Sequence, residues 1–243
     1  MRDSVKQLAY YFAGDRWPVL ECPVCLEGTL VLKKDSLETF DSRASIREYE
    51  SSGDQMMLSG IFCGHLVCTS SRCGDCVAVV GDYGWDPEEA GYGLEDVYRV
   101  RALHPPVRVI DSPESTPESV RATLKRAAGV AWQDPSTGIS LLRQSVERLL
   151  DEQGIDPLTA SGGFRSLKFR IEEYKKKNAE VAELLEALRF AGNSGAHEDE
   201  LTIEEFLKTA QIIELALKML YQKESMAARE HAKRIVEACK YVP

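Results

Sequence analysis

An arginine and a histidine near the start of the last third of the chain are the residues best suited to chemistry. Arg189 lies near the end of an amphipathic stretch, and His197 follows it across a break that contains Asn193 and two glycines. An arginine stabilises negative charge on a phosphate, while a histidine takes up and returns a proton near neutral pH. This pattern indicates phosphate chemistry without a metal, with Arg189 and His197 as candidate catalytic residues.

A purely structural role explains the same residues equally well. The glycines around Asn193 are helix stop signals, so His197 can simply cap backbone groups of the next connection. Arg189 can pair with a carboxylate such as Glu147. Arg143 and Glu147 stand four residues apart, so they can form an ion pair on one helical turn or orient Arg189. The sequence leaves this choice open.

Cysteines in the first third of the chain carry the second chemical signal. The chain has seven cysteines, an odd number that fits metal ligands better than a set of disulfides. Cys22 and Cys25 form a C-x2-C turn, which suits two adjacent corners of a zinc tetrahedron. Four thiolates would leave the zinc no open position, so we expect a structural zinc site.

Two pairings compete for the other two corners of this site. The candidates are Cys63, Cys68, Cys73 and Cys76. Spacing favours Cys73 with Cys76, because this pair repeats the first C-x2-C turn. Cys76 also opens an apolar strand, where a cysteine is commonly a small buried hydrophobic residue, and this leaves Cys68 with Cys73 as the second choice. His65 is a weaker ligand candidate.

Composition limits the class of protein. The chain has 243 residues, of which 44% are hydrophobic and 28% are charged, as in an ordinary globular protein. No run approaches the roughly 18 apolar residues that span a bilayer, and the N-terminus is charged, so we expect a cytoplasmic protein without a membrane segment. A net charge of -9 argues against non-specific coating of DNA.

Hydrophobic periodicity divides the chain into a β-rich part and a helical part. Residues 1–16 have apolar spacing typical of a helix. Short alternating runs then predict a β module over residues 17–110, with strands expected at 29–32, 46–49, 57–67 and 77–80, and an extended segment at 97–110. Residues 111–116 are rich in proline, serine and acidic residues, which is typical of a linker.

The helical period begins at Pro117 and continues to residue 221. Thr116 is the expected N-cap of the first helix, and Thr202 with Glu205 forms a capping box before the last long helix. Residues 222–243 are predicted to form a charged helical tail. The expected fold class is therefore α+β, mainly α, with a small β-rich zinc ribbon followed by a bundle of four to five helices.

Two parts of the chain resemble a known family. The run 62–74, which holds Cys68 and Cys73 as C-x4-C-G, and the strand that follows at 77–82 resemble the second knuckle of a prokaryotic family catalogued as domain of unknown function 4145. The helical half resembles it through residues 139–150, 167–171 and 189–197. The resemblance covers about residues 20–80 and 115–221. It implies Cys22, Cys25, Cys68 and Cys73 as the zinc ligands.

That family is similar in turn to the HEPN superfamily. These helical domains occur in toxin–antitoxin, abortive-infection and restriction systems, and many are metal-independent ribonucleases. The resemblance implies that His197 assists attack of a ribose 2′-hydroxyl on the adjacent phosphate, while Arg189 stabilises the developing charge, often in a dimer. This chain departs from the pattern, since seven residues separate Arg189 from His197 where active HEPN nucleases have four to six.

Three functional hypotheses follow. The first is a defence- or restriction-associated HEPN-like homodimer that binds RNA or another nucleic acid and acts as a metal-independent ribonuclease. The second is a non-catalytic adaptor whose zinc ribbon docks a protein partner of a defence system. The third is a sensor for a small ligand or nucleotide, with a polar pocket between the helices.

Overall fold

A computed structural model describes residues 3–14, 16–85, 96–194, 201–222, 230–231 and 234–236. The chain divides into two compact units. The sheet unit comprises Met1–Val109, Ala128–Gly138 and Thr202–Leu207, and the helical unit comprises Ile110–Ala127, Ile139–Leu201 and Lys208–Pro243. His197 and most of the tail predicted at 222–243 lie outside the described residues.

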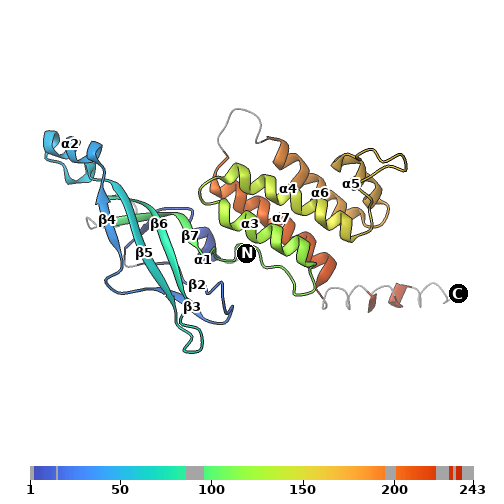
Figure 1. The fold of residues 1–243 in the computed structure, drawn as a ribbon, viewed down its shortest axis with the longest axis horizontal. Helices are drawn as coiled ribbons and strands as arrows, with labels where there is room; N and C mark the ends of the chain where they lie inside the picture. Colours follow the sequence, from blue (N-terminus) through green and yellow to red (C-terminus); the bar gives the residue numbers. More distant parts are fainter. Residues whose placement is uncertain are drawn as a thin grey trace. The chain divides into compact units, whose positions relative to one another are not determined.

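The sheet unit is built around one antiparallel sheet (Figure 1), in which β5 is the central strand. Along one edge β5 pairs with β6, and along the other it pairs first with β4 and then with β3. The strand order is β1-β7-β6-β5-β3-β2, with β4 beside β5. The strands are β1 (Phe12–Ala13), β2 (Leu20–Glu21), β3 (Thr29–Leu32), β4 (Glu38–Asp41), β5 (Gly60–Cys68), β6 (Cys76–Trp85) and β7 (Asp96–His104).

Alternation along β5 and β6 gives the sheet one buried face and one open face. Phe62 and Leu66 of β5 and Val77 and Val79 of β6 are buried. The residues that alternate with them along each strand belong to the open face, on which Ile61 is exposed. This period of two is the burial pattern of an antiparallel sheet that packs on one side only.

An aromatic cluster fills the buried side near β1 and β7. The ring of Trp17 lies 5.0 Å from that of Phe12 and 5.8 Å from that of Phe62, and Phe62 meets Tyr98 edge-on at 5.1 Å. Phe12 also pairs with Tyr98 through the backbone. This pairing explains why helix α1 covers only Asp3–Gln7 rather than the predicted residues 1–16, because Phe12–Ala13 continue the sheet as β1.

The strand predicted at residues 46–49 is wrong, since these residues belong to helix α2 (Arg43–Ser52). Ser42 caps this helix by accepting a hydrogen bond from the Ser45 backbone N–H. Gly53 ends it in the left-handed conformation, with φ of 70°. These two caps stabilise a helix in a sequence whose apolar alternation predicted a strand. The 3-10 helix η1 (Gln55–Met57) then leads into β5.

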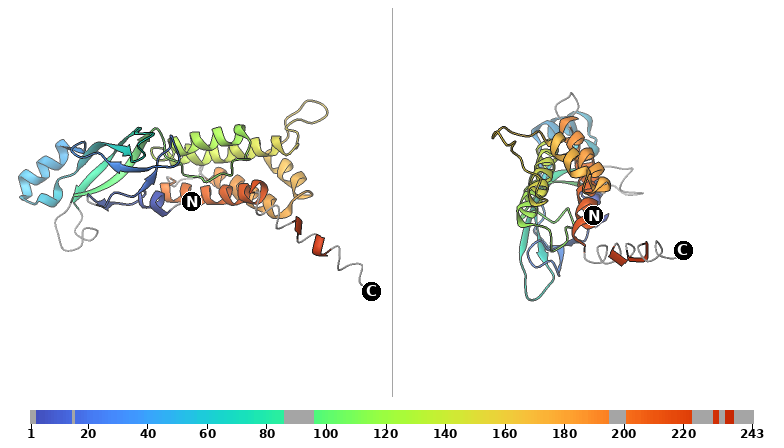
Figure 2. Two further views of the ribbon diagram at one scale, coloured as in Figure 1. Left: turned by 90° about the horizontal axis from the view of Figure 1, so that it is seen from below. Right: turned by 90° about the vertical axis from the view of Figure 1, so that its right-hand side faces the viewer.

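Five helices, as predicted from the period, follow in the described part of the chain. They are α3 (Glu118–Val130), α4 (Pro135–Glu152), α5 (Leu167–Lys175), α6 (Ala179–Ser194) and α7 (Ile203–Tyr221). Figures 1 and 2 show α3, α4, α6 and α7 side by side, and each buries an apolar face. No helix among the described residues has the length and apolarity needed to cross a bilayer.

Of the two helix caps predicted from the sequence, the structure confirms the one before α7 and not the one before α3. Thr202 and Glu205 form the predicted capping box, in which the Thr202 N–H donates to Glu205 at 2.8 Å and the Glu205 N–H donates to Thr202 at 3.3 Å. Thr116 is not the cap of α3, since its buried hydroxyl has no hydrogen-bond partner among the described residues. Pro117 takes that place instead, and its carbonyl accepts from the Arg121 N–H.

The register between β6 and β7 shifts at a bulge between Val80 and Gly81, and the close packing of Gly81 at this point can be tested. A Cβ on Gly81 would lie 2.0 Å from the Arg99 carbonyl oxygen, whereas a Cβ on Gly84 of the same strand would meet nothing closer than 3.7 Å. We expect Gly81→Ala to reduce the free energy of unfolding by about 2–3 kcal/mol and Gly84→Ala to change it by less than about 1 kcal/mol. Urea titration measures both, and equal effects would contradict this packing.

Candidate metal centre and arginine sites

Two hairpins of the sheet unit hold the cysteines that the resemblance implied. Cys22 and Cys25 lie in the turn between β2 and β3, while Cys68 and Cys73 lie at the turn between β5 and β6. The pairing of Leu30 with Cys68 in β3 and β5 brings the two turns together. Sheet register therefore assembles a cluster from residues that stand more than 40 positions apart.

The four Sγ atoms all lie within 4.8 Å of one another. The Sγ atoms of Cys22 and Cys73 are 3.8 Å apart, and those of Cys25 and Cys68 are 3.7 Å apart. Four thiolates around one ion with metal–sulfur bonds of about 2.3 Å would stand about 3.8 Å from one another. The cluster therefore has the donor set and the spacing to hold a tetrahedral metal ion.

Backbone geometry around the thiols fits a metal ligand set as well. The Gly28 N–H donates to Cys25 Sγ at 3.3 Å, and the Ser70 N–H donates to Cys68 Sγ at 3.4 Å. A Cβ on Gly28 would lie 2.4 Å from Cys68 Sγ, so a glycine is needed where the two turns meet. Such N–H donors stabilise thiolates, which are the form that binds a metal.

The surroundings of the thiols shift their pKa values in opposite directions. Hydrogen bonds from the backbone of Glu27 and of Gly28 lower the pKa of Cys25 to about 7. The backbone of Asp75 also favours the thiolate of Cys73, but burial and the Asp75 carboxylate outweigh it and raise the pKa of Cys73 to about 12. Burial is the main cause that raises the pKa of Cys68. Without a cation, Cys25 and Cys73 are therefore not ionised together near neutral pH.

The other ligand candidates lie outside this cluster. Cys76, the alternative that spacing favoured, is exposed at the start of β6. Cys63 and His65 belong to the open face of β5. Cys68, which ends β5, takes the corner because the β5–β6 turn closes through its backbone N–H on the Asp75 carbonyl at 2.9 Å. The spacing of the cysteines along the sequence does not reveal this hydrogen bond.

In the helical unit, Arg189 is held in one orientation. Its Nε donates to Glu186 Oε2 at 2.9 Å, and its Nη2 donates to Glu186 Oε1 at 2.7 Å. The guanidinium carbon also lies 4.2 Å from the centre of the Phe190 ring. These hydrogen bonds lower the pKa of Glu186 and raise the pKa of Arg189. The carboxylate that holds Arg189 is thus Glu186, one turn earlier on α6, and not Glu147.

The rest of the predicted Arg/His site is described only in part. Helix α6 does not break at Gly192 but continues to Ser194, so the backbone of Asn193 lies one turn beyond Arg189. A glycine inside a helix costs only about 1 kcal/mol, which the buried side chains of α6 offset. Arg143 and Glu147 are half-buried on α4. His197 lies outside the described residues, so its distance from Arg189 stays a prediction.

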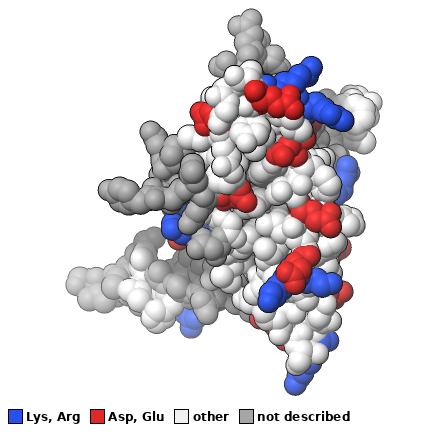
Figure 3. Space-filling model, turned by 90° about the vertical axis from the view of Figure 1, so that its left-hand side faces the viewer, with Lys and Arg blue, Asp and Glu red and all other residues white. Residues whose placement is uncertain are grey.

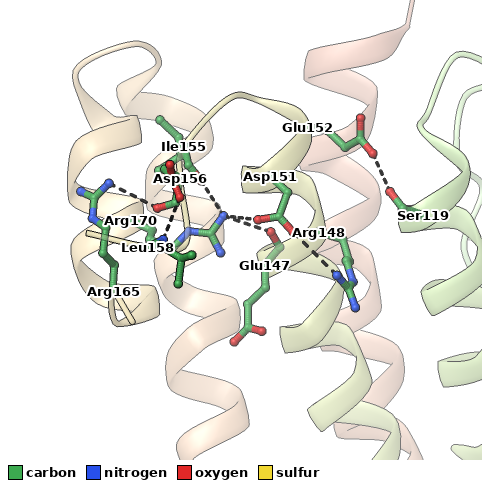
Figure 4. Close-up of polar contacts among 10 residues, drawn as sticks. All are labelled: Ser119, Glu147, Arg148, Asp151, Glu152, Ile155, Asp156, Leu158, Arg165 and Arg170. Carbon is green, nitrogen blue, oxygen red and sulfur yellow. Dashed lines mark hydrogen bonds and ion pairs between the residues drawn. The ribbon is translucent and has the colours of Figure 1, made fainter. Parts of the chain in front are cut away.

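A second arginine cluster lies between α4 and α5, and sequence reasoning missed it (Figure 4). Arg170 is 4% exposed, and its Nη2 donates to Asp151 Oδ1 at 2.6 Å and to the Ile155 carbonyl at 2.7 Å. Arg165 contacts Glu173, which lowers the pKa of Glu173 through their hydrogen bond. An arginine directly after Phe164 in a glycine-containing loop was the only signal of this cluster in the sequence.

Comparisons with known proteins identify two domains and no function. The family model "Domain of unknown function (DUF4145)" matches residues 125–238, and "Domain of unknown function (DUF8608)" matches residues 10–99. The first match confirms the predicted family for the helical half, whereas the cysteine-containing part at 20–80, which the resemblance also assigned to that family, is matched by the second model instead. Searches of curated proteins and of solved structures found no match.

The cysteine cluster predicts which thiol variants lose a bound metal. We expect wild-type protein to carry about one metal ion per chain and Cys73→Ser to lose most of it, because three thiolates and a hydroxyl bind less tightly. Cys76→Ser is the matched control, since it removes an exposed thiol of the same segment and should retain the metal. Elemental analysis of both variants measures this, and metal loss in Cys76→Ser alone would contradict the cluster.

The pKa values predict the order in which the metal-free thiols react. Because only the thiolate attacks iodoacetamide, Cys25, with a pKa of about 7, should be alkylated before Cys73, whose pKa is about 12. The rate at Cys25 should rise as pH increases through about 7 and level off above it. Peptide mass spectrometry from about pH 5 to about pH 9 follows both sites. Equal rates at the two sites would show that the cluster is not preformed.

Proposed function

We propose that this chain, whose residues 125–238 belong to the DUF4145 family, is a zinc-stabilised, HEPN-like protein that binds RNA and cleaves it without a catalytic metal. Its setting is prokaryotic defence or restriction, as the resemblance to HEPN domains implies. Zinc has a structural role in the sheet unit, and the reacting groups lie in the helical unit.

Zinc is the metal that the sheet unit suits best. Four thiolates in tetrahedral array are the ligand set of structural zinc sites, and the two Sγ separations of 3.7 and 3.8 Å support this assignment. All four positions are filled by the protein, which leaves no open position for a substrate or an activated water. The ion, when bound, links the β2–β3 turn to the β5–β6 turn, as in a zinc ribbon.

The single observation that carries the nuclease proposal is the fixed orientation of Arg189. Its side chain is 13% exposed, and Glu186 holds it through Nε and Nη2. The Nη1 atom carries two further N–H donors that can contact a phosphate. An arginine held in place before the substrate arrives stabilises transition-state charge without first losing side-chain entropy. His197, eight positions further on, would move the proton of the ribose 2′-hydroxyl.

The face of the sheet unit in Figure 3 supports placing RNA on the helical unit instead. On that face the described lysines and arginines are few, lie mostly at the edges and are interspersed with carboxylates, so they form no broad basic patch. Contact with a nucleic-acid backbone requires a row or patch of cations. Together with the net charge of -9, this argues that the sheet unit has a supporting role.

Cleavage of RNA in a magnesium-free solution with EDTA tests this function. We expect His197→Ala and Arg189→Ala to reduce the cleavage rate at least about 100-fold, because general acid–base and charge-stabilising groups each contribute roughly that much or more. His104→Ala is the matched control, since His104 is an exposed histidine of β7. Products with a 2′,3′-cyclic phosphate would identify attack by the ribose hydroxyl. The zinc content is measured after the assay to confirm that EDTA left the sheet unit intact.

Cleavage that is unchanged in His197→Ala would contradict the mechanism. If intact protein neither binds nor cleaves RNA, the adaptor role is favoured instead. The observation in its favour is the open face of the sheet, where Phe40 pairs with Ile61 and both side chains are exposed, and where Val80, opposite Cys63 on the next strand, is exposed as well. Exposed apolar groups that adjoin one another on a sheet are typical of protein interfaces.

A further inference from the structure

A cavity of about 290 Å³ lies in the helical unit beside the Arg170 cluster. Helix α4, the α4–α5 loop and α5 all contribute to it. Its lining residues are Glu147, Arg148, Asp151, Pro157, Phe164, Arg165, Leu167 and Arg170. Three arginines against two carboxylates give this lining a positive formal charge, although the whole chain carries -9.

The α4–α5 loop holds an aromatic ring at this cavity. Leu158 and Phe164 form an antiparallel bridge, the Thr159 N–H donates to the Gly163 carbonyl at 2.7 Å, and the Arg165 N–H donates to the Pro157 carbonyl at 2.8 Å. Gly162 turns the loop with φ of 83°. The loop is thus tied by its own hydrogen bonds, yet the Phe164 side chain is 91% exposed. An exposed ring on an ordered loop is typical of a stacking platform.

The three arginines differ in how the protein holds them. Arg170 is buried, and it fixes the floor of the cavity through Asp151, the Ile155 carbonyl and, at 3.4 Å, the Glu147 carbonyl. Its buried Nε has no hydrogen-bond partner among the described residues. Arg165 contacts the Glu173 carboxylate through Nη2 and the Asp156 carbonyl through Nη1 at 3.3 Å, so a phosphate would have to share its donors with these groups. Arg148 is 52% exposed, and its Nη1 stands 3.8 Å from the same Asp151, beyond hydrogen-bond distance. Because Arg170 already binds Asp151 closely, Arg148 retains donors for an anion.

We propose that this cavity binds one nucleotide, with its base stacked on Phe164 and its phosphate contacted by Arg148 and Arg165. A plain anion would leave the exposed ring unexplained, and an apolar ligand would leave the arginines unexplained. The volume is at the low end of ligand pockets, which suits a single nucleotide rather than a dinucleotide. The nucleotide is either free in solution or one residue of an RNA strand.

This site is independent of the RNA cleavage proposed for Arg189 and His197, because it uses other residues of the helical unit. Either proposal can therefore fail alone. The binding probes are chosen to avoid cleavage, since an oligonucleotide with 2′-O-methyl groups lacks the hydroxyl that attacks the phosphate.

The test is the affinity of the full chain for two probes, adenosine 5′-monophosphate by calorimetry and a 2′-O-methyl oligoadenylate of about ten nucleotides by fluorescence anisotropy. We expect Phe164→Ala and Arg148→Gln each to weaken binding of the preferred probe about tenfold. Phe169→Ala and Arg126→Gln are the matched controls, since both remove exposed side chains of the same kind outside the cavity and should leave the affinity unchanged. Circular dichroism checks that all four variants are folded.

Binding of the monophosphate that depends on Phe164 and Arg148 would identify a free nucleotide as the ligand. Binding of the oligonucleotide alone, with the same dependence, would identify an RNA strand. Binding that the control variants weaken as much as the cavity variants would overturn the proposal, and so would the absence of binding to either probe. Adenosine without its phosphate should bind at least about tenfold more weakly than the monophosphate, because Arg148 then has no anion to contact.

Discussion

Four cysteine Sγ atoms lie within 4.8 Å of one another in the sheet unit, and this closeness determines which charge states of the thiols are favourable. As thiolates they repel one another, and as thiols they lose hydrogen bonds to water on burial, so neither state is favourable without a cation. Backbone hydrogen bonds of Glu27 and Gly28 lower the pKa of Cys25 to about 7, whereas the Asp75 backbone, which favours the thiolate of Cys73, is outweighed by burial and the Asp75 carboxylate, which raise the pKa of Cys73 to about 12, so these two thiols do not ionise together. A divalent cation would allow all four to ionise by compensating several negative charges at once. A bound ion would link the β2–β3 turn to the β5–β6 turn and so would add to what the buried Leu20 and Leu30 contribute to the order of these short strands.

In the helical unit a buried charge is compensated by a salt bridge within the protein. Arg170 is buried where α5 meets the end of α4, and Asp151 together with two backbone carbonyls neutralises and solvates it. Removing one partner of such a pair leaves a buried charge, which costs several kcal/mol. Ile155 lies three residues beyond the end of α4, so its hydrogen bond with Arg170 fixes the start of the α4–α5 loop. The start of the α4–α5 loop is thus held by a charge, and the loop can carry exposed side chains without losing its shape.

Local sequence signals predicted the parts of this structure whose interactions are local. The Thr202–Glu205 capping box, the helical period after Pro117 and the C-x2-C turn at Cys22 all depend on residues within a few positions of one another. Residues 46–49 were missed for a local reason, because the caps at Ser42 and Gly53 outweigh the apolar alternation between them. Two other features depended on distant partners: Phe12 is in a strand because Tyr98 pairs with it, and Cys68 is preferred to Cys76 because of sheet register. The Arg170 cluster has no repeat or characteristic spacing, and the arginine after Phe164 gives no partner for it, so the contacts of Arg170 with Asp151 and Ile155 could be seen only in the fold.

The proposed binding of RNA and of a nucleotide is compatible with the net negative charge of the chain because individual carboxylates and backbone groups position its arginines. Glu186 orients Arg189, Glu173 contacts Arg165, and Asp151 lies beside both Arg148 and Arg170. A protein with a net charge of -9 repels a polyanion at long range, so attraction must arise within about one Debye length, roughly 8 Å at physiological salt. Binding by a few oriented guanidinium groups then favours particular nucleotides over nucleic acid in general. It also keeps the number of phosphate contacts small, and the affinity for RNA should fall with salt much less steeply than for a protein with a basic surface.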